Sequence, residues 1–431
     1  MSIPTAAVAE AAPAPAPAEV KQTRSWKAPV AFALCTLVEI LLLALPVPGD
    51  RVTRIDLNDR AVRLELAPLL LPTLLTNLLL GAGLAAMTLV SFLRAARARS
   101  VPPWFAPLFG LLWVVALVVF IGAGSNVPLS WLLTGALALS TPLIFGSMAG
   151  LVSERAGVVN IAIEGQLLAG AFTSALIASM TGSTVAGLLG GVVAGVLVSL
   201  VLAVFSIRYV VEQVVVGVVV NILVIGLTNF LYSSLMSDDP ARYNAPPRYP
   251  VLPLPGLSEI PVIGPLLFNN TPIVYLMFLL VPTLAFALFR TRWGLRVRAV
   301  GEHPKAADTV GIRVNPTRFR NVLLSGAIAG AGGSFFTLGM VGEFTREMTS
   351  GAGYIALAAL IFGRWHPVYA ALAALLFGFA SNLKALASQV GANVPAEFMA
   401  MIPYLVTILA VAGFVGQSRA PAADGKPYIP S

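Results

Sequence analysis

The chain of 431 residues is 58% hydrophobic and only 11% charged. A soluble domain has charges on about 25% of its residues, so this composition excludes an ordinary soluble protein. The formal net charge of +8 is compatible with nucleic-acid binding, but the basic residues cluster in particular loops, as they do on the cytoplasmic side of membrane proteins. We therefore expect a protein that lies in the lipid bilayer and binds no nucleic acid.

Apolar segments long enough to cross a bilayer recur along the chain. A hydrocarbon core of about 30 Å requires about 20 apolar residues in a helix, and isolated strands cannot satisfy their backbone in lipid. The sequence thus predicts an all-α, polytopic membrane helix bundle with about 10–12 transmembrane helices. The predicted segments are 29–48, 66–93, 104–123, 130–150, 157–180, 184–207, 213–236, 272–290, 321–341, 353–363, 367–388 and 397–416.

Composition and motif density divide the chain into four regions. Residues 1–28 are rich in Ala and Pro, which is typical of a disordered tail. Residues 29–128 are predicted to form accessory transmembrane helices, and residues 129–416 to form the core. Residues 417–431 are predicted to be a second tail.

The distribution of Lys and Arg predicts the orientation in the membrane. The loop 290–320 holds eight basic residues and two acidic ones, so we place it in the cytoplasm. Counting crossings from this loop puts both termini in the cytoplasm and the Pro-rich loop 237–271 outside.

Polar residues open the predicted helix 157–180. Glu154 and Arg155 fall at the cytoplasmic end of the preceding helix, where charges are tolerated. Asn160 and Glu164 are spaced four residues apart and are predicted to share one helical face. An ionisable side chain at such a place is expected to face the bundle interior or a water-filled cavity.

Two interpretations of this polar pair stay open. Asn160 and Glu164, with Gln166 beside them, either line or gate a polar pathway, or the carboxylate has a structural role. In the structural interpretation Glu164 accepts hydrogen bonds from backbone amides of a neighbouring broken helix, or pairs with Arg155.

Small residues recur at helical spacing further along the core. They are typical of helices whose backbones approach each other closely in lipid. The positions are Gly146 with Gly150, Gly187 with Gly191 and Gly195, and Gly326 with Gly330.

A second polar group lies in the stretch VVEQVVVGVVVN, residues 210–221. Glu212 and Gln213 open an apolar helix, where the helix dipole favours an acid. Asn221 lies two turns deeper. Gln213 and Asn221 are therefore further candidates for the polar pathway.

A short helix is predicted in the basic loop, within GLRVRAVGEHPKAADTVGI, residues 294–312. Pro304 suits the first helical position and Gly311 the position just past the end. Ala306 and Ala307 are expected to leave a small surface for docking. Because a lone short helix is marginal in water, this one is expected to pack either on its own membrane domain or in a groove of a partner.

The segment 353–363 is too short to span the membrane. We expect either a half-helix or a helix that joins its neighbour across Gly363–Pro367. A faint similarity between residues 156–165 and 352–363 suggests a core of two inverted halves, as in many transporters.

Several kinds of chemistry are missing from the sequence. No GxxxxGK[ST] phosphate loop is present, so the chain itself is not expected to bind ATP. It has two histidines, His303 and His366, and no Cys/His cluster, which argues against a metal site. The serines of the apolar helices have no histidine nearby in the sequence, so nothing indicates hydrolysis. We expect no cofactor and no catalytic residue in this chain.

Four motifs in order resemble the permease subunits of bacterial ABC importers: ERAGVVNIAIEG, EQVVVGVVVN, RAVGEHPKAADTVGI and SGAGYIALAALIFGRWHP. The branch they resemble moves nucleosides and simple sugars and is related to the ribose and branched-chain amino-acid permeases. The resemblance covers roughly residues 130–431.

The resemblance implies a multi-pass subunit of the bacterial plasma membrane that pairs with a second homologous permease. ATP-binding subunits carrying ATP and Mg²⁺ would drive it, and an extracellular binding protein or lipoprotein would deliver the substrate. Asn160 and Glu164 would fall on the helix that lines the translocation path. The loop that contacts the ATPase would include Gly301, Glu302, Pro304, Ala306, Ala307 and Gly311.

Two rival functions remain from the residues alone. The first is a self-contained secondary transporter that is coupled to protons through Glu164. The second, weaker one is an intramembrane enzyme or scaffold.

Overall fold

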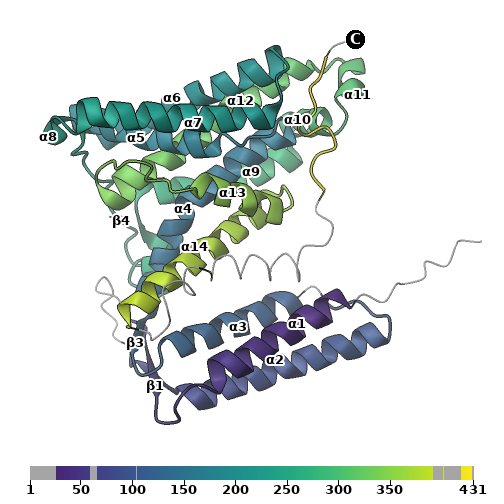
Figure 1. The fold of residues 1–431 in the computed structure, drawn as a ribbon, viewed down its shortest axis with the longest axis vertical. Coiled ribbons are helices and arrows are strands. Elements are labelled where there is room, and N and C mark those ends of the chain that lie inside the picture. The colour runs from purple at the N-terminus through teal and green to yellow at the C-terminus, as the bar shows by residue number, and fades with distance from the viewer. Residues whose placement is uncertain (1–25, 59–65, 103, 392–400, 402–418, 430–431) are drawn as a thin grey trace, which may run out of the picture.

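The computed structural model describes residues 26–58, 66–102, 104–391, 401 and 419–429. Within these residues the chain is mostly helical, with two small sheets (Figure 1). Nine helices of this part are long and apolar enough to cross a membrane, and two shorter apolar helices accompany them. The predicted class of a polytopic helix bundle is therefore confirmed. The predicted segment 397–416 and most of the predicted tail 1–28 lie outside the described residues.

The first helices form a layer of their own, shown in purple and blue in Figure 1. Their elements are α1 (Lys27–Val38, continued by the π-helical turn Glu39–Ala44), β1 (Val52–Asp56), β2 (Leu69–Pro72), α2 (Thr73–Ala96), α3 (Phe105–Ile121) and β3 (Asn126–Pro128). Strand β1 pairs antiparallel with β2 and parallel with β3. Residues 69–72 were expected in a helix; they form a strand because they pair with β1.

The core consists of long helices that follow β3. They are α4 (Leu129–Arg155), α5 (Ile163–Thr181), α6 (Thr184–Ala203), α7 (Gln213–Leu231), α9 (Pro272–Arg290), α12 (Val314–Ser334), α13 (Ala352–Phe362) and α14 (Pro367–Gln389). Helices α6, α7 and α12 are continued by the π-helical segments Val204–Arg208, Tyr232–Met236 and Phe335–Val341. The connections contain α8 (Pro240–Tyr243), β4 (Leu252–Pro253), a π-helical turn (Gly264–Phe268), β5 (Asn269–Asn270), α10 (Arg292–Glu302) and α11 (Pro304–Thr309).

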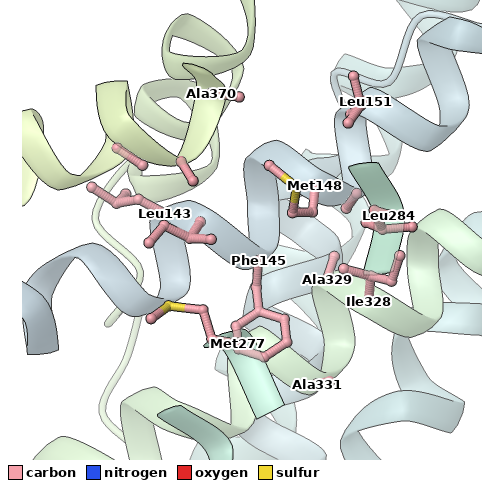
Figure 2. Close-up of a cluster of buried hydrophobic side chains, with 14 of the residues drawn as sticks. Leu143, Phe145, Met148, Leu151, Met277, Leu284, Ile328, Ala329, Ala331 and Ala370 are labelled. Carbon is pink, nitrogen blue, oxygen red and sulfur yellow. The ribbon is translucent and has the colours of Figure 1, made fainter. Parts of the chain in front are cut away.

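Helix α4 lies at the centre of the core. Every residue from Ser140 to Glu154 is buried, whereas a helix with one side against lipid would leave some of these residues exposed. Figure 2 shows its side chains Leu143, Phe145 and Met148 among residues of α9, α12 and α14. The surrounding helices therefore enclose α4 in protein.

Glycines bring α5, α6 and α12 into backbone contact. A Cβ atom added to Gly195 of α6 would lie 2.1 Å from the carbonyl oxygen of Gly326, and one added to Gly330 of α12 would lie 2.1 Å from that of Gly191. A Cβ on Gly170 of α5 would meet the Gly330 carbonyl oxygen at 2.5 Å. The predicted glycine faces are confirmed, because the contact between α6 and α12 has no room for a side chain. This contact is called the glycine seam below.

The predicted break before α14 is a complete interruption. Helix α13 ends at Phe362, and Arg364 and Trp365 both adopt left-handed φ angles, of 52° and 53°. Pro367 then opens α14. The segment 353–363 is therefore a separate short helix and does not join its neighbour.

The seam gives a test of the packing. We expect Gly195→Ala to lower the free energy of unfolding by about 1–3 kcal/mol, because the added methyl group must push two helix backbones apart. The matched control is Gly226→Ala in α7, where nothing lies within 4 Å of the added Cβ atom; it should be neutral or stabilise the helix by about 0.5–1 kcal/mol. Thermal unfolding in detergent measures both. Equal midpoints for the two variants would contradict the close approach of α6 and α12.

Candidate functional site

The connection between α4 and α5 is a break in the helical backbone. Residues 156–162 form two turns joined by residues 158–160, which belong to no helix or strand, and Gly157 has a φ of +86°. A Cβ atom at Gly157 would lie 2.7 Å from Nη2 of Arg318. The prediction that Asn160 and Glu164 share a helical face is therefore wrong: Asn160 precedes α5 and Glu164 lies in its first turn.

Asn160 and Gln166 join α5 to two other helices. The Asn160 amide donates to Ser325 Oγ of α12 at 2.9 Å and to Gln166 Oε1 at 3.1 Å. The Gln166 amide donates to Ser199 Oγ of α6 at 2.8 Å. All four side chains are completely buried, so this cluster connects helices inside the protein.

Two side chains of α7 bind the broken backbone directly. Gln213 Oε1 accepts a hydrogen bond from the Val159 amide at 2.8 Å. Asn221 accepts from the Gly165 amide at 2.8 Å and donates to the Ile161 carbonyl at 2.9 Å. Backbone groups freed by a broken helix need such partners when no water reaches them. Helix α7 supplies them within the break and at the start of α5.

Glu164 binds the start of helix α13. Its Oε1 accepts from Thr349 Oγ1 at 2.6 Å and from the Gly351 amide at 2.9 Å, and its Oε2 accepts from the Gly353 amide at 2.6 Å. The first amides of a helix have no partner within the helix and carry positive partial charge. The structure thus has the contact that the structural interpretation expected, with backbone amides of a broken helix.

The alternative pairing of Glu164 with Arg155 is wrong. Arg155 donates from Nε and Nη2 to the Trp365 carbonyl at 2.9 and 2.7 Å. Glu154 is only 2% exposed and accepts a hydrogen bond from the Trp365 indole. Both residues lie at the end of α4, as predicted, and the left-handed turn after α13 covers Glu154 there.

The five predicted pathway residues therefore meet around one backbone break. Asn160, Glu164, Gln166, Gln213 and Asn221 are all buried, with exposed fractions of at most 5%. Sequence reasoning missed their partners, among them Ser199, Ser325, Thr349 and Tyr354. Tyr354 follows the glycines that open α13, and its hydroxyl accepts from Asn221 at 3.2 Å. It is 48% exposed, so the buried network reaches the protein surface there.

The loop after α9 contains two helices. Pro304 opens α11, and Gly311, with a φ of +83°, follows its end, as predicted. Helix α10 was not predicted. A Cβ atom on Gly301 would lie 2.2 Å from the Arg155 carbonyl oxygen, so only glycine lets α10 pack on the end of α4.

Helix α11 packs on its own protein through Ala307. This side chain is 3% exposed and lies in an apolar cluster with Val300, Val314 and Tyr428. The expectation that Ala307 forms a docking surface is wrong, and the alternative that the helix packs on its own domain is confirmed. Ala306 is exposed, and Val310 is 74% exposed.

The C-terminal segment 419–429 covers this region and runs beside α10 and α11 (yellow in Figure 1). The Ala423 amide donates to the Gly301 carbonyl at 2.9 Å. Arg318 of α12, only 2% exposed, donates to the Lys426 carbonyl at 2.8 Å. Burial raises the pKa of the Asp424 carboxyl to about 7, although Arg318 opposes this shift. The segment is therefore part of the folded core.

Comparison with known proteins gives a family match. The model of the family described as "Branched-chain amino acid transport system / permease component" matches residues 132–411. The guanosine ABC transporter permease protein NupQ of Bacillus subtilis is 41% identical over 314 residues, which are 70% of this chain and 97% of the relative.

Two further relatives cover similar lengths. The nucleoside ABC transporter permease protein NupC of Lactococcus lactis is 40% identical over 68% of this chain and 95% of its own length. A Haloferax volcanii protein, provisionally named the glucose ABC transporter permease protein TsgC13, is 32% identical over 64% of this chain and 89% of its own length. No solved structure matches the chain.

The contacts of Glu164 predict the result of a conservative substitution. Glu164→Gln replaces one acceptor oxygen with an NH₂ group that faces donors, so it should lower the free energy of unfolding by about 1–3 kcal/mol. Glu343→Gln, at an exposed position of the connection between α12 and α13 that also contains Thr349, is the control and should leave stability unchanged. Thermal unfolding in detergent measures both. An unchanged melting temperature for Glu164→Gln would instead favour a role confined to the pathway.

Proposed function

The chain belongs to the family of branched-chain amino acid transport system permease components, and on this premise we propose that its substrate is a nucleoside. It is a membrane-spanning, non-catalytic permease subunit of an ABC importer. The proposal of a nucleoside rests on the 41% and 40% identity with permeases named for guanosine and nucleosides, against 32% with the one named for glucose. A simple sugar is the second candidate.

The chemistry of the buried network supports a neutral, hydroxyl-rich substrate. Apart from Glu164, the network consists of amide and hydroxyl groups. Both oxygens of Glu164 are occupied by donors, which favours a fixed contact over the proton relay of a secondary transporter. We propose that Asn160, Glu164, Gln166, Gln213 and Asn221 form the frame of the translocation path, and that Tyr354 stands at its surface.

The orientation and the partners follow from the family and the charge pattern. We propose that the loop with α10 and α11 and both termini lie on the cytoplasmic side of a bacterial plasma membrane, since that loop is strongly basic. Partner subunits would bind ATP and Mg²⁺, a second homologous permease would complete the path, and an extracellular binding protein would deliver the substrate. Residues 29–128 would be accessory to the core 129–416.

The exposed side of α11 is the proposed contact with the ATPase. Gly301 and Ala307 hold α10 and α11 to the core, and Glu302 accepts from the Ala422 amide at 3.2 Å. Pro304 and Gly311 set the two ends of α11. Ala306 and Val310 remain as apolar groups that face outward.

Uptake of radiolabelled guanosine into proteoliposomes tests the function. With the permease pair, the ATPase and the binding protein, uptake should require ATP and persist after an uncoupler collapses the proton gradient. Excess unlabelled inosine should compete, and excess glucose should not. Uptake that runs on a proton gradient without ATP would contradict an ABC importer. Competition by glucose alone would transfer the assignment to sugars.

Docking of the ATPase is tested at Val310. Val310→Asp should reduce ATPase co-purification at least fivefold, because it places a charge on an apolar contact, and it should leave membrane insertion intact. Val251→Asp, at a position 55% exposed in the Pro-rich loop, is the control. Ala307→Arg is expected to unfold the loop because that side chain is buried. Normal co-purification of Val310→Asp would place the ATPase elsewhere.

A further inference from the structure

The C-terminal segment contacts three consecutive helices, α10, α11 and α12, that lie far before it in the sequence. On α10, the amides of Ala422 and Ala423 donate to Glu302 Oε2 at 3.2 Å and to the Gly301 carbonyl at 2.9 Å. On α11, Tyr428 packs in one apolar cluster with Ala307. The segment thus holds both helices of the loop from one side.

The third contact is with α12. Arg318 donates from Nη1 to the Lys426 carbonyl at 2.8 Å and from Nη2 to the Ala423 carbonyl at 3.4 Å. The guanidinium of Arg318 thus binds the segment on both sides of Asp424 and Gly425. A planar fork with donors in fixed directions suits such a double contact, and a lysine cannot reproduce it.

The same turn touches the break between α4 and α5. Gly425 has a φ of +73°, and a Cβ atom there would lie 3.4 Å from Cγ2 of Val159. Arg318 reaches the other end of the break, where a Cβ on Gly157 would meet its Nη2 at 2.7 Å. The Val159 amide is the group that Gln213 binds. The C-terminal turn therefore lies between the loop helices and the polar network.

We propose that residues 421–428 form a strap that transmits movement of α11 to the break at residues 156–162, and that Arg318 is the positioning residue that holds the strap. The inference rests on the proposed function, in which α11 contacts the ATPase. A helix of six residues is marginal on its own, so its position depends on what it packs against. The packing of Tyr428 on α11 connects this helix to the strap. The hydrogen bonds of Arg318 connect the strap to α12, next to Gly157.

The test uses the complete transporter in proteoliposomes and compares guanosine molecules imported per ATP hydrolysed. Tyr428→Ala removes the ring that packs in the cluster with Ala307, and Arg318→Lys keeps the charge but loses the double contact of the planar guanidinium. Both variants should lower this ratio at least fivefold, while the ATPase rate stays within twofold of wild type and both variants still unfold in a single cooperative transition. Lys426→Ala is the control, because its side chain bonds only the Ala422 carbonyl and its own carbonyl remains.

A second measurement needs only the permease. Trypsin can cut after Lys305 only when α11 opens locally. Cleavage at that bond, followed by mass spectrometry, should be at least threefold faster in Tyr428→Ala and Arg318→Lys than in wild type or Lys426→Ala.

The outcomes separate the two proposals. Wild-type ratio and wild-type cleavage in both variants would overturn the strap. Loss of ATP hydrolysis and import in parallel, in variants that no longer unfold in a single cooperative transition, would show that the segment is merely structural and would also overturn it. A third outcome combines faster cleavage in both variants with a wild-type protein that shows no ATP-driven guanosine import. It would confirm that the strap holds α11 but would overturn both the proposed function and the transmission of movement.

Discussion

The break between α4 and α5 leaves backbone groups unpaired inside the protein, and the core is built to satisfy them. Gln213 and Asn221 reach the break from α7, and Ser153 of α4 donates to the Val158 carbonyl at 2.7 Å. Glu164, at the other side, serves the first amides of α13. Because an unpaired buried group costs about 1–3 kcal/mol, each of these polar side chains has a fixed partner, and their positions are set together.

The polar network inside the core and the loop helices proposed to contact the ATPase both lie against this break. Its inner partners are the amides and hydroxyls of α5, α6, α7 and α12. On its outer side, Gly301 of α10 and the C-terminal segment lie against Gly157 and Val159, and Trp365 binds Arg155 just before the break. A movement of the helices on the inner side, or of α10 and the C-terminal segment on the outer side, would therefore displace the same residues of the break. This arrangement gives the polar residues that look isolated in the sequence a common place in the structure.

The sequence predicts the helices well and their interruptions poorly. Hydropathy locates most of the spans, and Pro304 and Gly311 predict the limits of α11, because these signals are local. The run from Gly157 to Met180 is mostly apolar, with few polar residues beyond Asn160, Glu164 and Gln166, so hydropathy extends the helix through a break that depends on Arg318 and α7. The burial of Ala307 under Tyr428 could not be predicted, since it depends on a contact between residues more than 100 positions apart.

The glycine seam between α6 and α12 has a thermodynamic consequence. Gly191, Gly195, Gly326 and Gly330 have no rotamers, so the two helices lose no side-chain entropy at these positions when they associate. The carbonyl oxygens also approach the opposite Cα atoms closely enough for weak C–H···O attraction. Once each helix has formed in the bilayer, docking across this seam is therefore opposed by little beyond the loss of helix motion.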